Sequence, residues 1–180
     1  MWLRTSDSDA LTLRRGERVD AAFTAWLDPA ATTTPTPPDG HFLLVAFGYT
    51  SCPDICPATL TAVHLALERL GAGAGHLVPI FVTVDPVRDT ADRLRQYLAS
   101  FDSRIRSISD PAVVATTLRE FHARAEARRF PSGNGYSIDH TAVLYVLDPE
   151  RRVIAALPEA TATLASDLVG ALSSNPAFRQ

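Results

Sequence analysis

The chain has 180 residues, of which 46% are hydrophobic, and its formal net charge at neutral pH is -3. This length suits one domain with a sizeable core, so we expect residues 1–180 to form a single compact unit. Lys and Arg never form a run longer than a pair, which excludes an extended nucleic-acid-binding surface. No window approaches the roughly 18 apolar residues of a membrane span, and no signal-peptide apolar region follows Met1–Arg4, so we expect a soluble chain.

The first forty residues carry no chemical motif. We expect residues 1–8 to be polar and mobile. Residues 10–13 and 19–27 flank Arg15-Gly16-Glu17, which predicts a β-hairpin at the edge of a sheet. Residues 28–40 are rich in Thr and Pro, which predicts an extended surface loop without ladder hydrogen bonds.

The two cysteines of the chain, Cys52 and Cys56, follow a short apolar run over residues 42–47. The run predicts a buried strand, and apolar residues at helical spacing predict a helix that begins at Pro57. Both thiols therefore fall in a strand-to-helix loop, where free N–H groups and the helix dipole stabilise thiolates.

Thiolates in such a loop have two uses. They bind soft metal ions or exchange with disulfides, and the spacing of Cys52 and Cys56 allows either. A third interpretation treats them as small buried hydrophobic residues. The Ser, Pro and Asp residues around the pair disfavour that interpretation, because structural cysteines usually lie among apolar neighbours.

Strand and helix patterns alternate in the rest of the chain. Residues 76–84, 105–108, 142–147 and 152–156 predict strands, the last pairing back antiparallel. Helices are predicted after Thr90, from Asp110 and over residues 161–172, and the Gly- and Pro-containing segment 130–137 predicts a loop. The alternation predicts an α/β fold with a mixed, mostly parallel sheet flanked by helices.

Among the five histidines, His140 is the best candidate for a functional site. It stands beside Asp139, after the 130–137 loop and immediately before a strong strand, at a sheet end where sites gather. The others are most simply surface or structural residues: His41, His64, His76 and His122. Two thiolates and one imidazole suit Cu(I), or Cu(II) or Zn(II) with a fourth ligand. Three ligands leave an open position through which a metal could pass to a partner.

Three segments of the chain resemble the SCO/SenC copper-binding proteins of cytochrome oxidase assembly. They read FGYTSCPDICP over residues 47–57, VDPVRDT over residues 84–90 and YSIDHT over residues 136–141. The resemblance covers residues 42–172 and implies a thioredoxin-like fold. It also implies that Cys52, Cys56 and His140 bind one copper ion, with His140 in the position of the cis-proline of thioredoxins.

The resemblance implies a function as well. The implied function is that of a copper metallochaperone, which would receive Cu(I) or Cu(II) from a copper donor. A thiol reductant would supply electrons to its cysteines. Its partner would be the CuA site of cytochrome c oxidase subunit II or another copper-receiving protein, in the periplasm or another extracytoplasmic compartment. The resemblance gives no ligand role to Asp85, Arg88 or Asp89, which we interpret as capping and loop-holding groups. A further hypothesis is that Asp139 orients the ring of His140.

The alternative function is enzymatic. A thiol-disulfide oxidoreductase would cycle Cys52 and Cys56 between dithiol and disulfide. Three residues separate the cysteines, where thioredoxin-like oxidoreductases usually have two, and His140 replaces their proline. These features favour copper binding without turnover. The intact ligand set also disfavours an interaction module that has lost both chemistries.

Overall fold

The computed structural model describes residues 13–20, 40–159 and 161–179. Its strands are β1 (Phe42–Gly48), β2 (Leu77–Thr83), β3 (Arg106–Ile108), β4 (Ala125–Arg129), β5 (Tyr136–His140), β6 (Val143–Leu147) and β7 (Val153–Pro158). Its helices are α1 (Ile55–Leu70), α2 (Ala91–Ala99), α3 (Pro111–Glu120) and α4 (Leu164–Ser173), with short 3-10 helices η3 (Gly71–His76) and η4 (Pro176–Arg179). None of these helices has the length and apolar character needed to cross a membrane.

Five strands form the main sheet, in the order β3-β2-β1-β6-β7. The central strand β1 is parallel to β2, which is parallel to β3. On the other side, β6 is antiparallel to both β1 and β7. The predicted mixed α/β sheet flanked by helices is therefore confirmed, with two parallel pairings and two antiparallel ones.

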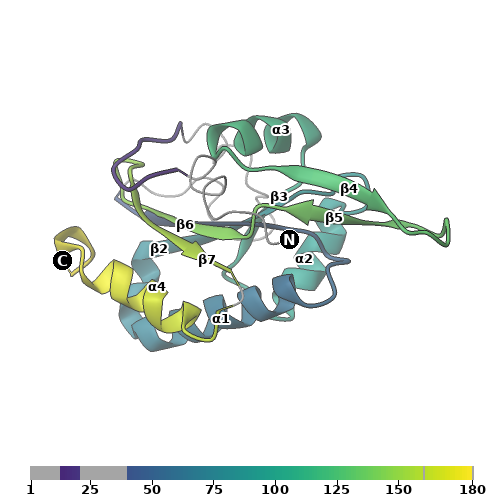
Figure 1. The fold of residues 1–180 in the computed structure, drawn as a ribbon. Helices are drawn as coiled ribbons and strands as arrows, with labels where there is room; N and C mark the ends of the chain where they lie inside the picture. Colours follow the sequence, from purple (N-terminus) through teal and green to yellow (C-terminus); the bar gives the residue numbers. More distant parts are fainter. Residues whose placement is uncertain (1–12, 21–39, 160, 180) are drawn as a thin grey trace, which may run out of the picture.

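Helices cover both faces of this sheet (Figure 1). Every residue of β1 is buried, and alternate side chains enter two separate cores. Phe42, Leu44 and Ala46 pack with α1, α2 and α4, whereas Leu43, Val45 and Phe47 pack with α3. Because each fully buried aliphatic or aromatic side chain contributes roughly 1.5–3 kcal/mol, these two cores hold β1 and the loop that follows it rigidly in place.

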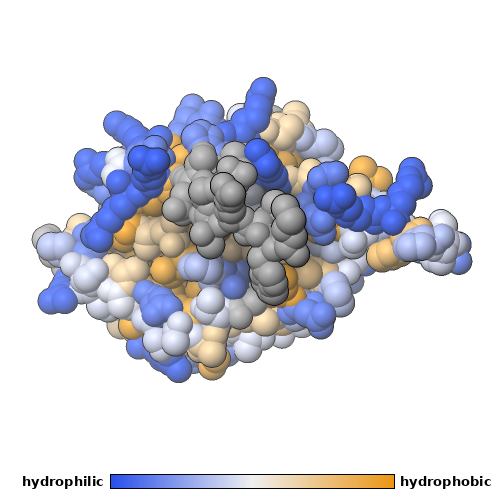
Figure 2. Space-filling view, viewed as in Figure 1, coloured by the Kyte–Doolittle hydropathy of each residue, from blue (hydrophilic) through white to orange (hydrophobic). Residues whose placement is uncertain are grey.

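Strands β4 and β5 form a separate two-stranded hairpin that projects beyond the main sheet (Figure 1). The expected loop over residues 130–137 is shorter than predicted, because Tyr136 and Ser137 already belong to β5. Strand β4 was not predicted. All five of its residues are exposed, so it lacks the apolar alternation that marks a half-buried strand, and hydrophilic residues cover much of the hairpin in Figure 2.

The predictions for residues 1–8 and 28–39 fall outside the described residues, as do most of the arms of the predicted N-terminal hairpin. The described part, residues 13–20, contains a turn at Gly16, whose φ of 93° favours glycine. This segment lies against the start of β7, where Gly16 N–H donates to the Val153 carbonyl at 2.8 Å and Val19 N–H to the Arg151 carbonyl at 2.9 Å.

Candidate metal centre

The loop that carries both cysteines joins the end of β1 to the start of α1. It turns back on itself where Cys52 N–H donates to the Tyr49 carbonyl at 3.1 Å. The helix begins at Ile55 and not at the predicted Pro57. The first four N–H groups of a helix have no acceptor within it, so a proline is tolerated at several positions of the first turn and does not mark its start. The earlier start places Cys56 within the first turn of α1.

The two thiols are free and lie in different surroundings. Cys52 is half-buried, whereas Cys56 is buried, and Cys56 N–H donates to Cys52 Sγ at 3.4 Å. Burial raises the pKa of the Cys56 thiol far above its usual value. Cys56 therefore keeps its proton at neutral pH until a cation arrives to stabilise the thiolate.

Gly48, the last residue of β1, makes room for the buried thiol. A Cβ atom added there would lie 2.7 Å from Cys56 Sγ and 2.8 Å from the ring of Phe81. Such contacts are shorter than van der Waals packing permits, so any larger residue at this position must displace Cys56 or Phe81. Sequence reasoning treated Gly48 only as the end of a strand.

His140 reaches the cysteines from the hairpin, where it is the last residue of β5. Its Nε2 atom lies 3.9 Å from Cys56 Sγ, and its Nδ1 atom lies 3.0 Å from the Thr141 carbonyl oxygen. A ring that donates from Nδ1 to this carbonyl presents the Nε2 lone pair to Cys56. Burial lowers the pKa of His140, which favours the neutral imidazole that binds metals.

Asp139 points away from this centre. Neighbouring residues of a strand face opposite sides, and the carboxylate of Asp139 is largely exposed and accepts from Arg128 Nε at 2.9 Å. The backbone contact that orients the imidazole of His140 belongs to the Thr141 carbonyl. The hypothesis that Asp139 orients the ring therefore finds no hydrogen bond in its favour among the described residues.

A fully buried carboxylate, Asp89, ties the cysteine loop to the end of β2. It accepts from Thr50 N–H at 2.9 Å, from the Thr50 hydroxyl at 2.5 Å and from the Thr83 hydroxyl at 2.7 Å. Thr90, beside it, caps α2 by accepting from Arg93 N–H at 3.3 Å. The loop-holding role expected of Asp89 is therefore confirmed, and its neighbour Thr90 supplies the helix cap.

A pocket of about 390 Å³ connects the centre with the surface. It is lined by Tyr49, Cys52, Pro53, Asp54, Ile55, Ser137, Ile138, Asp139, His140 and Ala142. Cys52 and His140 both line it, whereas the buried Cys56 does not. Cys52 and His140 are therefore the two predicted ligands that face this pocket.

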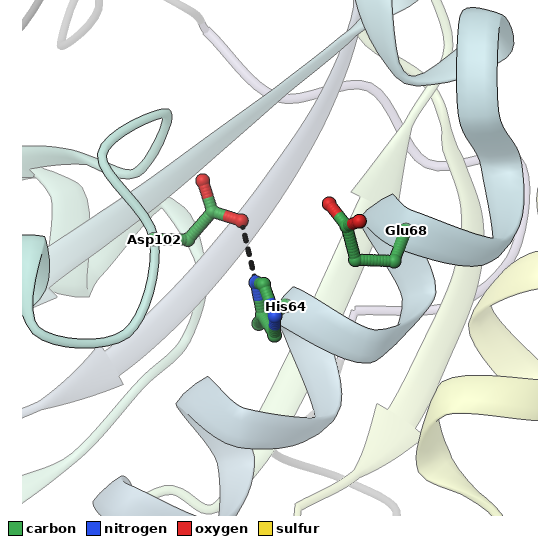
Figure 3. A group of neighbouring side chains, drawn as sticks. All are labelled: His64, Glu68 and Asp102. Carbon is green, nitrogen blue, oxygen red and sulfur yellow. Dashed lines mark hydrogen bonds and ion pairs between the residues drawn. The ribbon is translucent and has the colours of Figure 1, made fainter.

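A second group of ligating side chains lies elsewhere, between α1 and the loop that carries Asp102 (Figure 3). His64, Glu68 and Asp102 place their ligand atoms within 4.8 Å of one another, and His64 Nδ1 is 2.9 Å from Asp102 Oδ2. Arg104 donates to both carboxylates, at 2.7 Å in each case, and so already supplies their positive charge. This group is a brace that ties α1 to the segment before β3, in line with the structural role expected for His64.

The predicted ligands are less tightly grouped than this brace. Cys52, Cys56 and His140 do not have all three ligand atoms within 4.8 Å of one another, so a bound ion has to draw them together. Two of the histidines expected to be structural lie away from the cysteines. His41 and His76, whose ring centres are 6.1 Å apart, precede β1 and β2, at the ends of these strands opposite to the cysteine loop.

Comparison with known proteins gives concordant results. The family model described as SCO1/SenC matches residues 12–172. The SCO2-like protein of Rickettsia prowazekii is 34% identical over 117 residues, which make up 63% of this chain and 56% of that protein. The chain thus spans little more than half the length of this relative.

The solved structures that resemble this chain include proteins of the same family. The structure of Bradyrhizobium japonicum ScoI with copper bound matches with 34% identity and a TM-score of 0.65, covering 74% of this chain and 87% of that one. Yeast Sco1 with copper bound matches with 30% identity and a TM-score of 0.65, covering 78% and 81% respectively. The thioredoxin-like fold is shared with these structures, and the residues that match the family model include both cysteines and His140. The chain belongs to the SCO1/SenC family.

Proposed function

We propose that this protein is a copper metallochaperone that holds one copper ion between Cys52, Cys56 and His140. The observation that carries the proposal is the approach of His140 Nε2 to within 3.9 Å of Cys56 Sγ. Thiolate sulfur and imidazole nitrogen together form a ligand set that copper prefers. Family membership and the copper found in solved relatives support the same assignment.

The surroundings of these residues suit a cargo that enters and leaves. Each thiol releases a proton when it binds the ion, and the imidazole binds in its neutral form. Cys56, which is buried, and His140, 3.9 Å from it, would hold the ion from the protein side. Cys52 is half-buried and lines the surface pocket, so an incoming thiolate of a partner would replace Cys52 first and release the ion by ligand exchange.

The proposed recipient is the CuA site of cytochrome c oxidase subunit II, or another copper-receiving protein with exposed thiols. A separate copper donor or thiol reductant would restore the loaded or reduced state. Both exchanges belong in an extracytoplasmic compartment. Family membership supports these partners and this location.

A transfer experiment tests the proposal. The Cu(I)-loaded protein is mixed without oxygen with the copper-free soluble domain of subunit II, the two proteins are separated, and copper is measured in each. Copper should move from the parent protein to the recipient. The His140→Ala variant should bind copper so weakly that a competing chelator, added before the recipient, removes the ion. A protein that reduces the recipient's disulfide but carries no copper would instead be a thiol-disulfide oxidoreductase.

A further inference from the structure

We propose that Arg88, acting through Tyr136, is a positioning residue that sets the place of His140 relative to Cys56. The inference rests on the proposed copper site, because it concerns how one of the three ligands is brought to the other two. Arg88 would touch neither copper nor a ligand atom. Its effect would pass through the hairpin that carries His140.

The hairpin needs side-chain contacts to fix its position, because β5 pairs with β4 and with none of the described strands of the main sheet. No ladder of backbone hydrogen bonds therefore fixes β5 relative to β1, whose end carries the cysteine loop. Strand β4 is exposed along its whole length and has no core side chain to hold the hairpin down. The short link to β6, which begins at Val143, holds the His140 end of β5, so the direction of the rest of the strand must come from contacts that β5 makes with loops of the main body.

Alternate residues of β5 make these contacts. Tyr136, Ile138 and His140 share one side of the strand. Ile138 is buried in the core, and its N–H donates to the hydroxyl of Tyr49 at 3.3 Å. The ring of Tyr49 also packs edge-on against the His140 imidazole, with ring centres 6.1 Å apart. Tyr49, at the start of the cysteine loop, thus holds the half of β5 nearest His140.

The far half of β5 is held by Arg88, which lies in the loop after β2. The Arg88 guanidinium stacks 3.8 Å above the centre of the Tyr136 ring, and its Nη1 donates to the Tyr136 carbonyl at 3.1 Å. Asp85, itself buried, joins both partners. It forms an ion pair with Arg88 and accepts from the Tyr136 hydroxyl at 2.9 Å. Arg88, Asp85 and Tyr136 form a closed three-residue clamp.

The clamp acts at a distance along a stiff strand. Tyr136 lies four residues from His140, which is about 13 Å along an extended strand. Fixing both Tyr136 and Ile138 fixes the direction of β5, and this direction determines where the imidazole ends. With Tyr136 released, β5 would pivot at Ile138 and His140 would spend less time within bonding distance of copper.

The test compares two arginines that contact β5 from different sides. Arg88→Met removes the clamp. Arg128→Met removes an arginine of the hairpin itself, which pairs with Asp139 and Glu126 on the exposed side. Each variant is loaded with Cu(II), and the rate of copper loss to excess chelator is measured together with the nitrogen coupling in the electron paramagnetic resonance spectrum.

Arg88→Met should release copper about tenfold faster and show weaker nitrogen coupling, as expected when a group that orients a metal ligand is lost. Arg128→Met should change the rate by no more than about twofold, because exposed ion pairs contribute little. Tyr136→Phe keeps the stacked ring and loses one hydrogen bond. It should release copper a few times faster, which provides a test even if Arg88→Met folds poorly.

Combination with His140→Ala separates a positioning role from a general loss of structure. If Arg88 acts through His140, adding Arg88→Met to His140→Ala should not accelerate copper loss further. Equal rates for Arg88→Met and Arg128→Met, beside a fast His140→Ala variant, would overturn this inference alone. A His140→Ala variant that releases copper as slowly as the parent would overturn both this inference and the proposed ligand set.

Discussion

Cys56 Sγ and His140 Nε2 lie 3.9 Å apart although 84 residues separate them in the chain. Cys56 is placed by the first turn of α1, directly beyond the buried central strand β1. His140 is the last residue of β5, in a hairpin outside the main sheet. One proposed ligand therefore belongs to the packed core and the other to the β4–β5 hairpin. Substitutions in the core and in the hairpin should alter the centre in different ways.

On the core side, Gly48→Ala should disturb the centre by steric pressure. The added methyl group would fall 2.7 Å from Cys56 Sγ, so the thiol or the Phe81 ring has to move. Overpacking of this kind costs roughly 1–3 kcal/mol of folding free energy. Chemical denaturation should show that loss, and copper titration should show weaker binding. Gly170→Ala is the control, since nothing lies within 4 Å of a Cβ there; equal stability of the two variants would contradict the steric role of Gly48.

Asp89→Asn should loosen the cysteine loop. The Asp89 carboxylate accepts three hydrogen bonds while fully buried, and an amide cannot accept all three. Breaking one hydrogen bond to a charged group costs about 1.5–3 kcal/mol, which urea unfolding can measure. Asp92→Asn, three residues along, removes a carboxylate that is largely exposed, so it should change stability by less than about 0.5 kcal/mol. Similar losses in both variants would rule out the loop-holding role.

The brace at Asp102 should make the protein sensitive to acid. Burial alone would raise the pKa of Asp102, but hydrogen bonds from Arg104 and His64 outweigh it and hold this pKa well below its usual range. An acid with a lowered folded pKa stabilises the fold above its unfolded pKa of about 3.9 and loses this effect as the pH falls toward the folded pKa.

Asp102→Asn should therefore lower stability at neutral pH by about 2 kcal/mol. The deficit should shrink below about pH 3, where the parent protein loses the contribution of the ionised carboxylate. Urea unfolding of parent and variant across this range measures both quantities. A deficit that stays constant from neutral to acidic pH would show that the charge of Asp102 contributes nothing.

Glu159 should have the opposite pH dependence. Burial raises its pKa to about 8 and outweighs the opposite effect of the neighbouring Thr59 hydroxyl. The folded protein keeps this proton where the unfolded chain, with a pKa of about 4.3, has lost it. Stability therefore falls as the pH rises from about 4.3 through about 8.

Glu159→Gln removes the ionisable group while keeping the shape of the side chain. Its stability should match that of the parent near pH 4, exceed it by a growing margin as the pH rises from about 4.3, and exceed it by a constant margin above about pH 8. Thermal unfolding at a series of pH values provides the measurement. A parent and a variant with parallel stability curves would show that Glu159 does not carry a buried charge at high pH.

The sequence predicted the elements whose own residues are buried. Residues 42–47 and 76–84 form continuous apolar runs, and the structure contains β1 and β2 there. The position of Cys52 and Cys56 after β1 followed from the same local pattern. His140 was identified from its neighbours in the chain, but it was assigned to the approach of β6, whereas it ends the separate strand β5.

Contacts between distant residues carried no local signal. The β4–β5 hairpin was missed because the sequence Ala-Glu-Ala-Arg-Arg is exposed on both sides of β4. The requirement for Gly48 depends on Cys56 and Phe81, which only the folded chain brings near. An aromatic residue directly after a buried strand was the one signal that could have pointed to Tyr49, whose hydroxyl binds a residue 89 positions away.

The most direct test of the proposed ligand set is an anaerobic titration of the fully reduced protein with Cu(I) against a competing chelator. The same titration is made on Cys52→Ser, Cys56→Ser and His140→Ala, with His76→Ala, before β2 and away from the cysteine loop, as the control. The account predicts one tight equivalent in the parent and the control, with binding lost or weakened in all three ligand variants. Copper binding that is equally tight in the His140→Ala variant, or weak in the parent, would contradict it.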